Sequence, residues 1–249
     1  PPGQFHDGRP HVVHKTQSMT HRRTFLTTAI AGIGYWSAPL RSRAEAANDK
    51  LNLAVIGVGG RGAANLNGLA SQNIVALCDV DDRRAGKAYT RFPNARKFFD
   101  YRKMFDAMEG QIDGVVVSTP DHTHAAASAA GLHNGLHTYC EKPLTRTISE
   151  CRAITNLARE KKLVTQMGIQ IHAGENYRRV VELIRSDVIG SINEVHVWVN
   201  GNFGGKSRGS GKHKIPNSLN YDLWLGPISK EIPYHPTHHP FNWRQWWDF

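Results

Sequence analysis

A glycine-rich segment is the first part of the chain whose residue types and spacing indicate chemistry. The run from Gly57 to Gly62, Gly-Val-Gly-Gly-Arg-Gly, fits the pattern G-x-G-x-x-G without a mismatch. In that pattern the first glycine makes a tight turn, the second (Gly59) lets the backbone approach a pyrophosphate, and the third lets a helix pack on a strand. Free N–H groups at a helix N-terminus attract the phosphate anion. We therefore predict a dinucleotide-binding loop in which Gly60 and Arg61 also contact the cofactor.

An acidic residue follows at the spacing that such a loop requires. Asp79 ends the next apolar run, 22 residues after Gly57. An acid at this position accepts hydrogen bonds from the ribose hydroxyls of adenosine. Asp79 and Asp81 would repel the 2′-phosphate of NADP, so NAD is the expected cofactor and NADP the less favoured one. Arg83 and Arg84 lie close enough in the sequence to weaken that preference.

Two further polar clusters each follow a strongly apolar run. Residues 118–124 read Ser-Thr-Pro-Asp-His-Thr-His, and residues 139–144 read Tyr-Cys-Glu-Lys-Pro-Leu. If both runs are parallel strands, the clusters lie at the carboxyl edge of the sheet, near the nicotinamide end of a bound dinucleotide. The residues of these clusters that we expect to contact the cofactor are Thr119, Pro120, His122, His124 and Glu141.

The His-x-His pair could also suggest a metal site. His122 and His124 are two residues apart at the start of a predicted helix. Residues at positions i and i+2 of a helix do not face each other. Contacts with the cofactor or the helix start are therefore favoured, and no metal is expected.

Alternating apolar runs and helical segments must position these clusters. The expected strands cover residues 51–56, 74–78, 97–99, 113–118, 136–140 and 163–167. Helices are expected between them at residues 62–71, 82–91, 101–108, 122–134 and 148–161. Strands that alternate with helices predict an α/β fold with a doubly wound parallel sheet, the Rossmann fold, over residues 47–168.

The pattern changes after Gly168. A helix is expected at residues 175–186, followed by an alternating segment at 193–199 that places Val195, Val197 and Val199 on one face. Such alternation is typical of a half-exposed strand. We therefore expect residues 169–249 to be the start of an α+β domain with an antiparallel sheet, incomplete at Phe249, that binds substrate and forms oligomers.

The N-terminal segment resembles a twin-arginine export signal. Arg22 and Arg23 precede an apolar stretch at residues 25–36, and Ala-Glu-Ala at 44–46 fits a cleavage site that would leave Ala47 first. Residues 1–46 are therefore expected to be an upstream segment and signal peptide, and the protein to be periplasmic or secreted with a tightly held cofactor. The alternative is an amphipathic N-terminal helix that stays on the protein.

Composition restricts the remaining function classes. Apolar residues make up 40% and charged residues 21% of the 249 residues, as in a globular protein. The net charge is +10, but residues 1–46 carry 6 Lys/Arg and 2 Asp/Glu (+4), which leaves +6. Nucleic-acid binding is not favoured, and no apolar run approaches the ~20 residues of a membrane span. Three cysteines without a C-x-x-C pair predict neither a disulfide framework nor a zinc site.

With these motifs in place, the sequence resembles the Gfo/Idh/MocA family, which includes glucose–fructose oxidoreductase and inositol dehydrogenase. The matching elements are the glycine loop, Thr-Pro-Asp-His-Thr-His, Glu-Lys-Pro, and segments at 168–172, 221–227 and 242–248. The resemblance implies that Lys142 is catalytic and hydrogen-bonds the reacting hydroxyl, where an ammonium stabilises negative charge developing on oxygen. It implies further substrate-side residues, namely Gln170, His172, Trp243 and Arg244. By contrast, His235, His238 and His239 are expected to lie at the surface.

The resemblance also indicates which reaction to expect. It implies hydride transfer between a sugar or polyol and NAD, by a protein that is a homo-oligomer at full length. Family members usually place an aspartate and a histidine just beyond the Trp-Trp-Asp-Phe segment with which this chain ends, so we expect a C-terminally truncated chain. Two alternatives stay open: an NAD-dependent glycosidase of the same family, and a non-catalytic nucleotide- or sugar-binding fragment.

Overall fold

The computed structural model describes residues 50–201, 209, 211, 213–228 and 231–249. The chain divides into two units, residues 1–46 and 47–249, and the described residues all belong to the second. The predicted export signal and cleavage site lie outside the described residues. No helix in the described part is long and apolar enough to cross a membrane.

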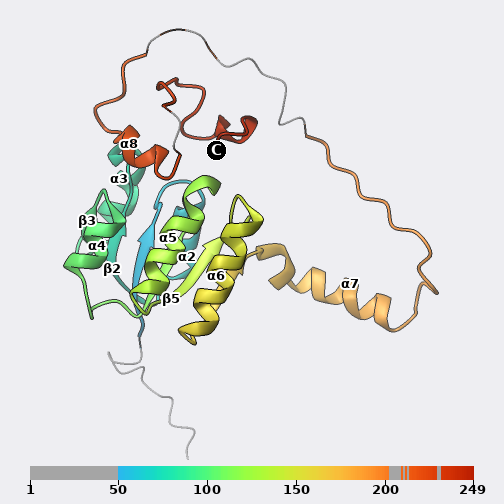
Figure 1. Cartoon of the computed structure of the whole chain (residues 1–249). Coiled ribbons are helices and arrows are strands. Elements are labelled where there is room, and N and C mark those ends of the chain that lie inside the picture. Colours follow the sequence, from blue (N-terminus) through green and yellow to red (C-terminus); the bar gives the residue numbers. More distant parts are fainter. Residues whose placement is uncertain (1–49, 202–208, 210, 212, 229–230) are drawn as a thin grey trace, which may run out of the picture. The chain divides into compact units, whose positions relative to one another are not determined.

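Six parallel strands form one sheet in the order β3-β2-β1-β4-β5-β6. Figure 1 labels β2, β3 and β5 of this sheet. The strands are β1 (Asn52–Ile56), β2 (Asn73–Cys78), β3 (Arg96–Phe98), β4 (Gly114–Val117), β5 (His137–Glu141) and β6 (Thr165–Gly168). The chain runs outward from β1 to β3 and then returns to place β4 on the other side of β1. This order confirms the predicted doubly wound sheet and makes β1 and β4 its switch point, where ligands bind.

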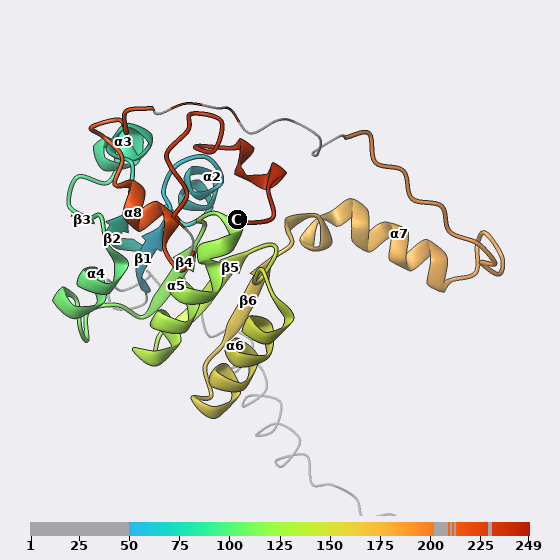
Figure 2. The ribbon, with the colours of Figure 1, turned by 45° about the horizontal axis from the view of Figure 1, so that its top comes forward.

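Helices cover both faces of the sheet (Figure 2). Side chains of α2 (Arg61–Gly68) and α3 (Asp82–Arg91) pack on one face. Side chains of α4 (Tyr101–Ala107) and α5 (Asp121–His133) pack on the other, and α6 (Ile148–Glu160) packs beside α5. The predicted helices are therefore confirmed, with ends that move by at most three residues, because their apolar spacing matches the buried faces.

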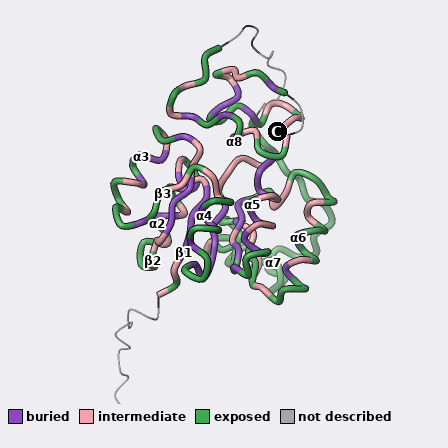
Figure 3. The backbone as a smooth tube through the Cα atoms, turned by 60° about the vertical axis from the view of Figure 1, so that its left-hand side comes forward, coloured by how far each residue is buried: buried purple, intermediate pink, exposed green. Residues whose placement is uncertain are grey.

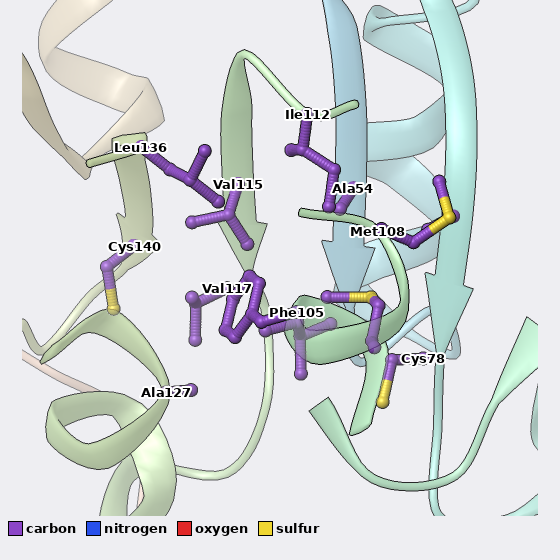
Figure 4. Close-up of a cluster of buried hydrophobic side chains, with 13 residues drawn as sticks. Ala54, Cys78, Phe105, Met108, Ile112, Val115, Val117, Ala127, Leu136 and Cys140 are labelled. Atoms are coloured by element: carbon purple, nitrogen blue, oxygen red, sulfur yellow. The ribbon is translucent and has the colours of Figure 1, made fainter. Parts of the chain in front are cut away.

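The central strands are apolar on both sides because both faces are buried. Ala54 and Ile56 of β1 point into the core under α4 and α5, whereas Val55 between them points toward α2 and α3. Figure 4 shows the first of these cores, in which Phe105 lies close to Val117. Each side of the sheet is thus filled by alternate residues of the same strands, as the period of a strand requires.

Side-chain caps fix where the helices begin. Asp81 accepts a hydrogen bond from the Arg83 amide at the start of α3, and Asp100 does the same for Arg102 at the start of α4. Thr147 and Glu150 form a reciprocal capping box at the start of α6. These caps satisfy backbone donors that have no partner within the helix. By contrast, the N-cap of α2 is Gly60, and this helix has no side-chain cap.

Residues 169–201 only partly follow the prediction. A short 3₁₀ turn, η2 (Gln170–Ala173), leads into α7 (Glu175–Arg185), which confirms the predicted helix. Residues 193–199 are not a strand in the structure, so that prediction is wrong. The alternating Val195, Val197 and Val199 are 74%, 82% and 77% exposed. A strand needs a neighbour to satisfy its backbone groups, and no strand among the described residues pairs with this segment.

The C-terminal residues form a small core of their own that packs on the end of β2. It contains α8 (Tyr221–Leu225) and the 3₁₀ turn η3 (Asn242–Gln245). Its buried members, which include Trp224, Trp243 and Phe249, pack with Val80. Figure 3 shows buried stretches of backbone beside α8. His238 and His239 are only 3% and 9% exposed, so their expected surface position is wrong.

We predict that two helical glycines respond in opposite ways to alanine. A Cβ on Gly131 in α5 would lie 2.6 Å from Cγ1 of Val115, a stiff side chain in the core. Gly131→Ala should therefore lower the free energy of unfolding by about 1–3 kcal/mol. Gly86→Ala in α3 meets nothing within 4 Å and should raise it by about 0.5–1 kcal/mol. Denaturant unfolding checks both, and equal effects would contradict the packing at Gly131.

Candidate functional site

A cleft of about 430 Å³ opens at the carboxyl edge of the sheet, where the ligand of a doubly wound fold binds. One wall comes from the glycine loop, the end of β2 and the loops after β4 and β5; the other comes from residues 223–224, 239–241 and 243–244. Most of the predicted site residues line this cleft: Gly57, Gly59, Gly60, Arg61, Asp79, Thr119, Pro120, His124, Glu141, Lys142, Gln170, Trp243 and Arg244.

At two positions of the glycine loop, the space beside Cα holds a hydrogen atom but not a Cβ atom. Gly57 has a φ of +79°, and a Cβ there would lie 2.7 Å from the Ser118 carbonyl oxygen. A Cβ on Gly62 would collide with the carbonyl oxygen of Gly57. Gly62 is buried beneath the loop and does not line the cleft, which fits the packing role of the third glycine. These contacts explain why the loop needs its glycines.

Asp79 lies against this loop at one end of the cleft. Its Oδ2 accepts hydrogen bonds from the amides of Val58 (2.9 Å) and Gly59 (3.2 Å), and its Oδ1 accepts one from Asp81 (3.0 Å). Burial raises the pKa of Asp79 from its usual value, although these hydrogen bonds oppose the rise. The Arg84 side chain runs beside Gly59. This end of the cleft therefore offers carboxylate acceptors and one guanidinium.

Glu141 connects three parts of the chain beneath the cleft. Its Oε1 accepts hydrogen bonds from Asn65 (2.8 Å), Gln170 (2.7 Å) and Arg61 (3.2 Å). Glu141 is only 5% exposed. Burial acts to raise its pKa, but the three donors outweigh burial and hold the pKa below its usual value. The carboxylate is therefore charged near neutral pH, and it fixes the start of α2 relative to β5.

The other end of the cleft carries several charged groups. Lys142 is exposed in the loop after β5, and Asp121 begins α5. The guanidinium of Arg244 lies 4.1 Å from the Trp243 ring centroid and 4.4 Å from that of Phe241. Burial raises the pKa of Asp121, while the positive charges of His124, Arg244 and Lys142 oppose that rise. An ammonium, a guanidinium and one carboxyl group can therefore meet a polar ligand here.

Two predicted site residues lie outside the cleft. His122 is buried, and its Nε2 donates to the Trp224 carbonyl oxygen at 2.8 Å. Burial lowers its pKa to about 4, so the ring is neutral, and it packs against Trp224 and Phe249. His172 is exposed and stacks on Tyr177 with ring centroids 4.5 Å apart. Neither ring lines the cleft, so the structure does not bring His122 and His172 together with the other predicted site residues.

A buried pair that the sequence did not indicate joins the two walls of the cleft. The Nε2 of His239 donates to Asp81 Oδ2 at 2.9 Å, and both side chains are buried. Burial lowers the pKa of His239. Asp81 also caps α3, which a sequence can suggest, but nothing in the local pattern of His239 indicates a partner 158 residues away. Among the described residues, no group of three metal-ligating side chains is present.

Comparison with known proteins places this site in a family. Residues 51–169 match the family profile described as the GFO_IDH_MocA oxidoreductase family with an NAD-binding Rossmann fold. Inositol 2-dehydrogenase of Salmonella typhimurium is 26% identical over 152 residues, which are 59% of this chain and 45% of the relative. A glycosyl hydrolase family 109 protein of Solibacter usitatus is 30% identical over 198 residues, 70% of this chain and 44% of the relative.

Solved structures share the fold. Myo-inositol 2-dehydrogenase from Lactobacillus plantarum superposes with a TM-score of 0.54 at 23% identity, over 57% of this chain and 43% of that protein. GenD2 from gentamicin A biosynthesis, solved in complex with NAD, gives 0.52 at 25% identity, over 56% and 40%. The chain spans less than half the length of these relatives. Through residues 51–169, the chain belongs to the Gfo/Idh/MocA family of oxidoreductases with an NAD-binding Rossmann fold.

Proposed function

We propose that this protein is an oxidoreductase that moves hydride between a nicotinamide and a carbon bearing a hydroxyl group in a sugar or polyol. One observation carries the proposal: the glycine loop, Asp79 and Lys142 line the same cleft. The loop and the aspartate are the groups that hold a dinucleotide, and the lysine is a group that can hold a reacting hydroxyl. The name of the inositol 2-dehydrogenase relative supports a polyol as the substrate class.

The residues present fit NAD. The first turn of α2 has no side-chain cap, so no capping side chain competes with a pyrophosphate at this helix N-terminus. Arg61 lines the same part of the cleft and can add a positive charge there. Asp79 offers carboxylate oxygens to a ribose, and its charge disfavours a 2′-phosphate, so we propose NAD rather than NADP. The NAD complex of GenD2 is consistent with this choice.

Lys142 is proposed as the residue that meets the substrate. The bound nicotinamide supplies or accepts the hydride. In the oxidising direction the hydroxyl proton passes to solvent as hydride leaves the carbon and the carbonyl forms; in the reducing direction hydride adds to the carbonyl carbon and a proton is taken up. In both directions the oxygen carries partial negative charge between the alcohol and the carbonyl, and the Lys142 ammonium would stabilise that charge by a hydrogen bond. Gln170, Trp243 and Arg244 line the cleft and are proposed to orient the other hydroxyl groups of the substrate.

A second activity has specific support. The glycosyl hydrolase family 109 relative matches 70% of this chain, more than the 59% matched by the inositol 2-dehydrogenase. In an NAD-dependent glycosidase, transient oxidation makes a neighbouring C–H acidic, and elimination then cleaves the glycosidic bond. Such an enzyme releases sugar without net formation of NADH, so the two activities differ in their products.

We predict that Lys142→Met lowers turnover by about 10²–10³-fold, because it removes a hydrogen bond that is strongest in the transition state. Its dissociation constant for NAD should stay close to that of the wild type. Lys87→Met, on the exposed face of α3, is the matched control. Turnover is measured as the change in nicotinamide absorbance with a panel of inositols and sugars. The measurement is made on the chain of 249 residues and on the protein expressed from the whole reading frame.

Two outcomes would overturn the proposal as stated. If wild-type protein binds NAD but no sugar or polyol changes the nicotinamide absorbance, hydride transfer to these substrates is wrong. If chromogenic glycosides are cleaved without net NADH, the glycosidase replaces the dehydrogenase. Mass analysis of the purified protein shows in the same experiment whether a dinucleotide is carried along.

The Glu141 carboxylate predicts a pH-dependent contribution to stability. Its pKa in the folded protein is below the ordinary glutamate value of about 4.3. The stabilisation is therefore fully present above that value and is lost as pH falls through the folded-state pKa. Glu141→Gln should lower the free energy of unfolding by about 1–2 kcal/mol near neutral pH, and the loss should vanish in acid.

Denaturant unfolding across the pH range measures this difference. Glu109→Gln, at an exposed position after α4, is the matched control and should show little effect at any pH. A loss of stability in Glu141→Gln that persists unchanged in acid would show that the charge of Glu141 is not what stabilises the network.

We further propose that residues 1–46 direct export through the twin-arginine route. The support is the Arg22-Arg23 pair, the apolar stretch at 25–36 and the Ala-Glu-Ala sequence at 44–46. N-terminal sequencing of the exported protein should find Ala47 first, and replacing both arginines by lysine should retain the protein in the cytoplasm. Active cytoplasmic protein that keeps residues 1–46 would contradict the proposal.

A further inference from the structure

The C-terminal segment, which here means residues 213–228 and 231–249, is attached to the loop between β2 and α3. Two backbone hydrogen bonds, of 2.8 and 3.0 Å, join residues 218–220 to residues 80–82. They flank a short antiparallel bridge between the same two stretches. This loop directly follows the strand that ends beside the glycine loop, so the segment is attached at the edge of the cleft.

A buried carboxylate–imidazole pair fixes a second point of the segment to the same loop. The Nε2 of His239 donates to Oδ2 of Asp81 at 2.9 Å, and the two side chains are 8% and 2% exposed. Among the acid–base contacts of the described residues, no other has both side chains buried to this extent. Such a pair adds little stability compared with apolar residues, but separating it leaves a buried carboxylate without its partner. The pair is therefore suited to holding the segment in one position.

From His239 onward, the segment runs along the cleft from one end to the other. Burial lowers the pKa of His239, and the nearby charge of Asp79 opposes that shift. Five residues later, Arg244 is close enough to Asp121 to act on its pKa, as Lys142 also is, although burial of Asp121 is the larger effect. His239, Arg244 and three of the four residues between them line the cleft. A ligand that fills the cleft is therefore covered along its length by this stretch.

We propose that the C-terminal segment is a lid over the dinucleotide, and that Asp81 and His239 are positioning residues that hold this lid closed. The inference rests on the proposed function, because it needs the cofactor to lie in this cleft. A bound dinucleotide lies between the glycine loop and residues 239–244, so it enters and leaves when the pair separates. Opening of the lid then limits the rate of cofactor exchange.

Other contacts keep the rest of the segment in place when the pair separates. The Trp224 carbonyl oxygen accepts a hydrogen bond from Nε2 of His122 at 2.8 Å, at the start of α5. The Asp248 carbonyl oxygen accepts one from Arg146 at 2.6 Å, in the loop after β5. Loss of the Asp81–His239 pair therefore frees the end of the lid that lies beside β2 without releasing the whole segment.

The kinetics of NAD binding to the ligand-free chain of 249 residues test the lid directly. Rapid mixing is followed by tryptophan fluorescence, because Trp224 and Trp243 line the cleft. In the wild type, the observed rate should level off at high NAD concentration, at the rate of lid opening. An observed rate that rises in proportion to NAD over the whole range would overturn the lid.

Variants of His239 test the positioning role. His239→Phe keeps a ring that can pack against Trp224 but removes the donor to Asp81. It should raise both the limiting rate of binding and the rate of NAD release by about tenfold or more. His239→Gln, whose amide can donate in place of the ring nitrogen, should bring both rates back toward the wild type. A rise in the release rate alone would indicate a lost contact with NAD and would overturn the positioning role.

Two further variants separate positioning from folding. His133→Phe, at an exposed position in the last turn of α5, is the matched control and should keep both wild-type rates. If His239→Phe does not fold, Asp81→Ser takes its place, because serine still caps α3 but is too short to reach His239. Asp81→Ser should raise both rates as well.

The outcomes also separate the lid from the proposed reaction. Binding and release are measured without a substrate, so a protein without turnover still tests the lid. A protein that binds NAD with the same rates in the wild type and in both variants of the pair would overturn the lid alone. A protein that binds no NAD would overturn the cofactor site and the lid together.

Discussion

The close approach of the glycine loop to the ends of β2 and β4 is the constraint on which the rest of the site depends. The Gly57 amide donates to the Cys78 carbonyl oxygen at 2.8 Å, and its Cα faces the Ser118 carbonyl with no room for a side chain. The Asp79 carboxylate then accepts hydrogen bonds from two amides of the same loop. Because the loop contacts both neighbouring strands, the start of α2 lies in one place at the edge of the cleft.

Polar side chains then join the walls of the cleft in pairs. Glu141 fixes the start of α2 and Gln170 to the end of β5, and His124 connects the loops after β4 and β5. Asp81 and His239 attach the C-terminal segment to the end of β2. Each pair is buried or partly buried, where hydrogen bonds are strong and an unpaired group is costly. These few polar contacts therefore fix the positions of the segments that form the cleft relative to one another.

The two histidines of the Thr-Pro-Asp-His-Thr-His motif have different hydrogen-bond partners although they are close in the sequence. They are two residues apart, on one helix, and equally buried. His122 meets aromatic rings and a single carbonyl group, so burial keeps it neutral. His124 meets two carbonyl groups and a nearby carboxyl group. A helix turns about 100° per residue, so neighbouring positions of one motif enter different surroundings.

The sequence by itself determined the features that are local. The glycine spacing, the acid after β2 and the alternation of strands and helices are set by backbone sterics and by the period of apolar residues, so the sheet and most of the cleft residues were predictable. Only the tertiary structure decided which histidines face the cleft, that His239 meets Asp81, and that residues 193–199 have no strand to pair with. The reason is physical: a side chain's partner and a strand's neighbour come from distant parts of the chain, and no local pattern specifies them.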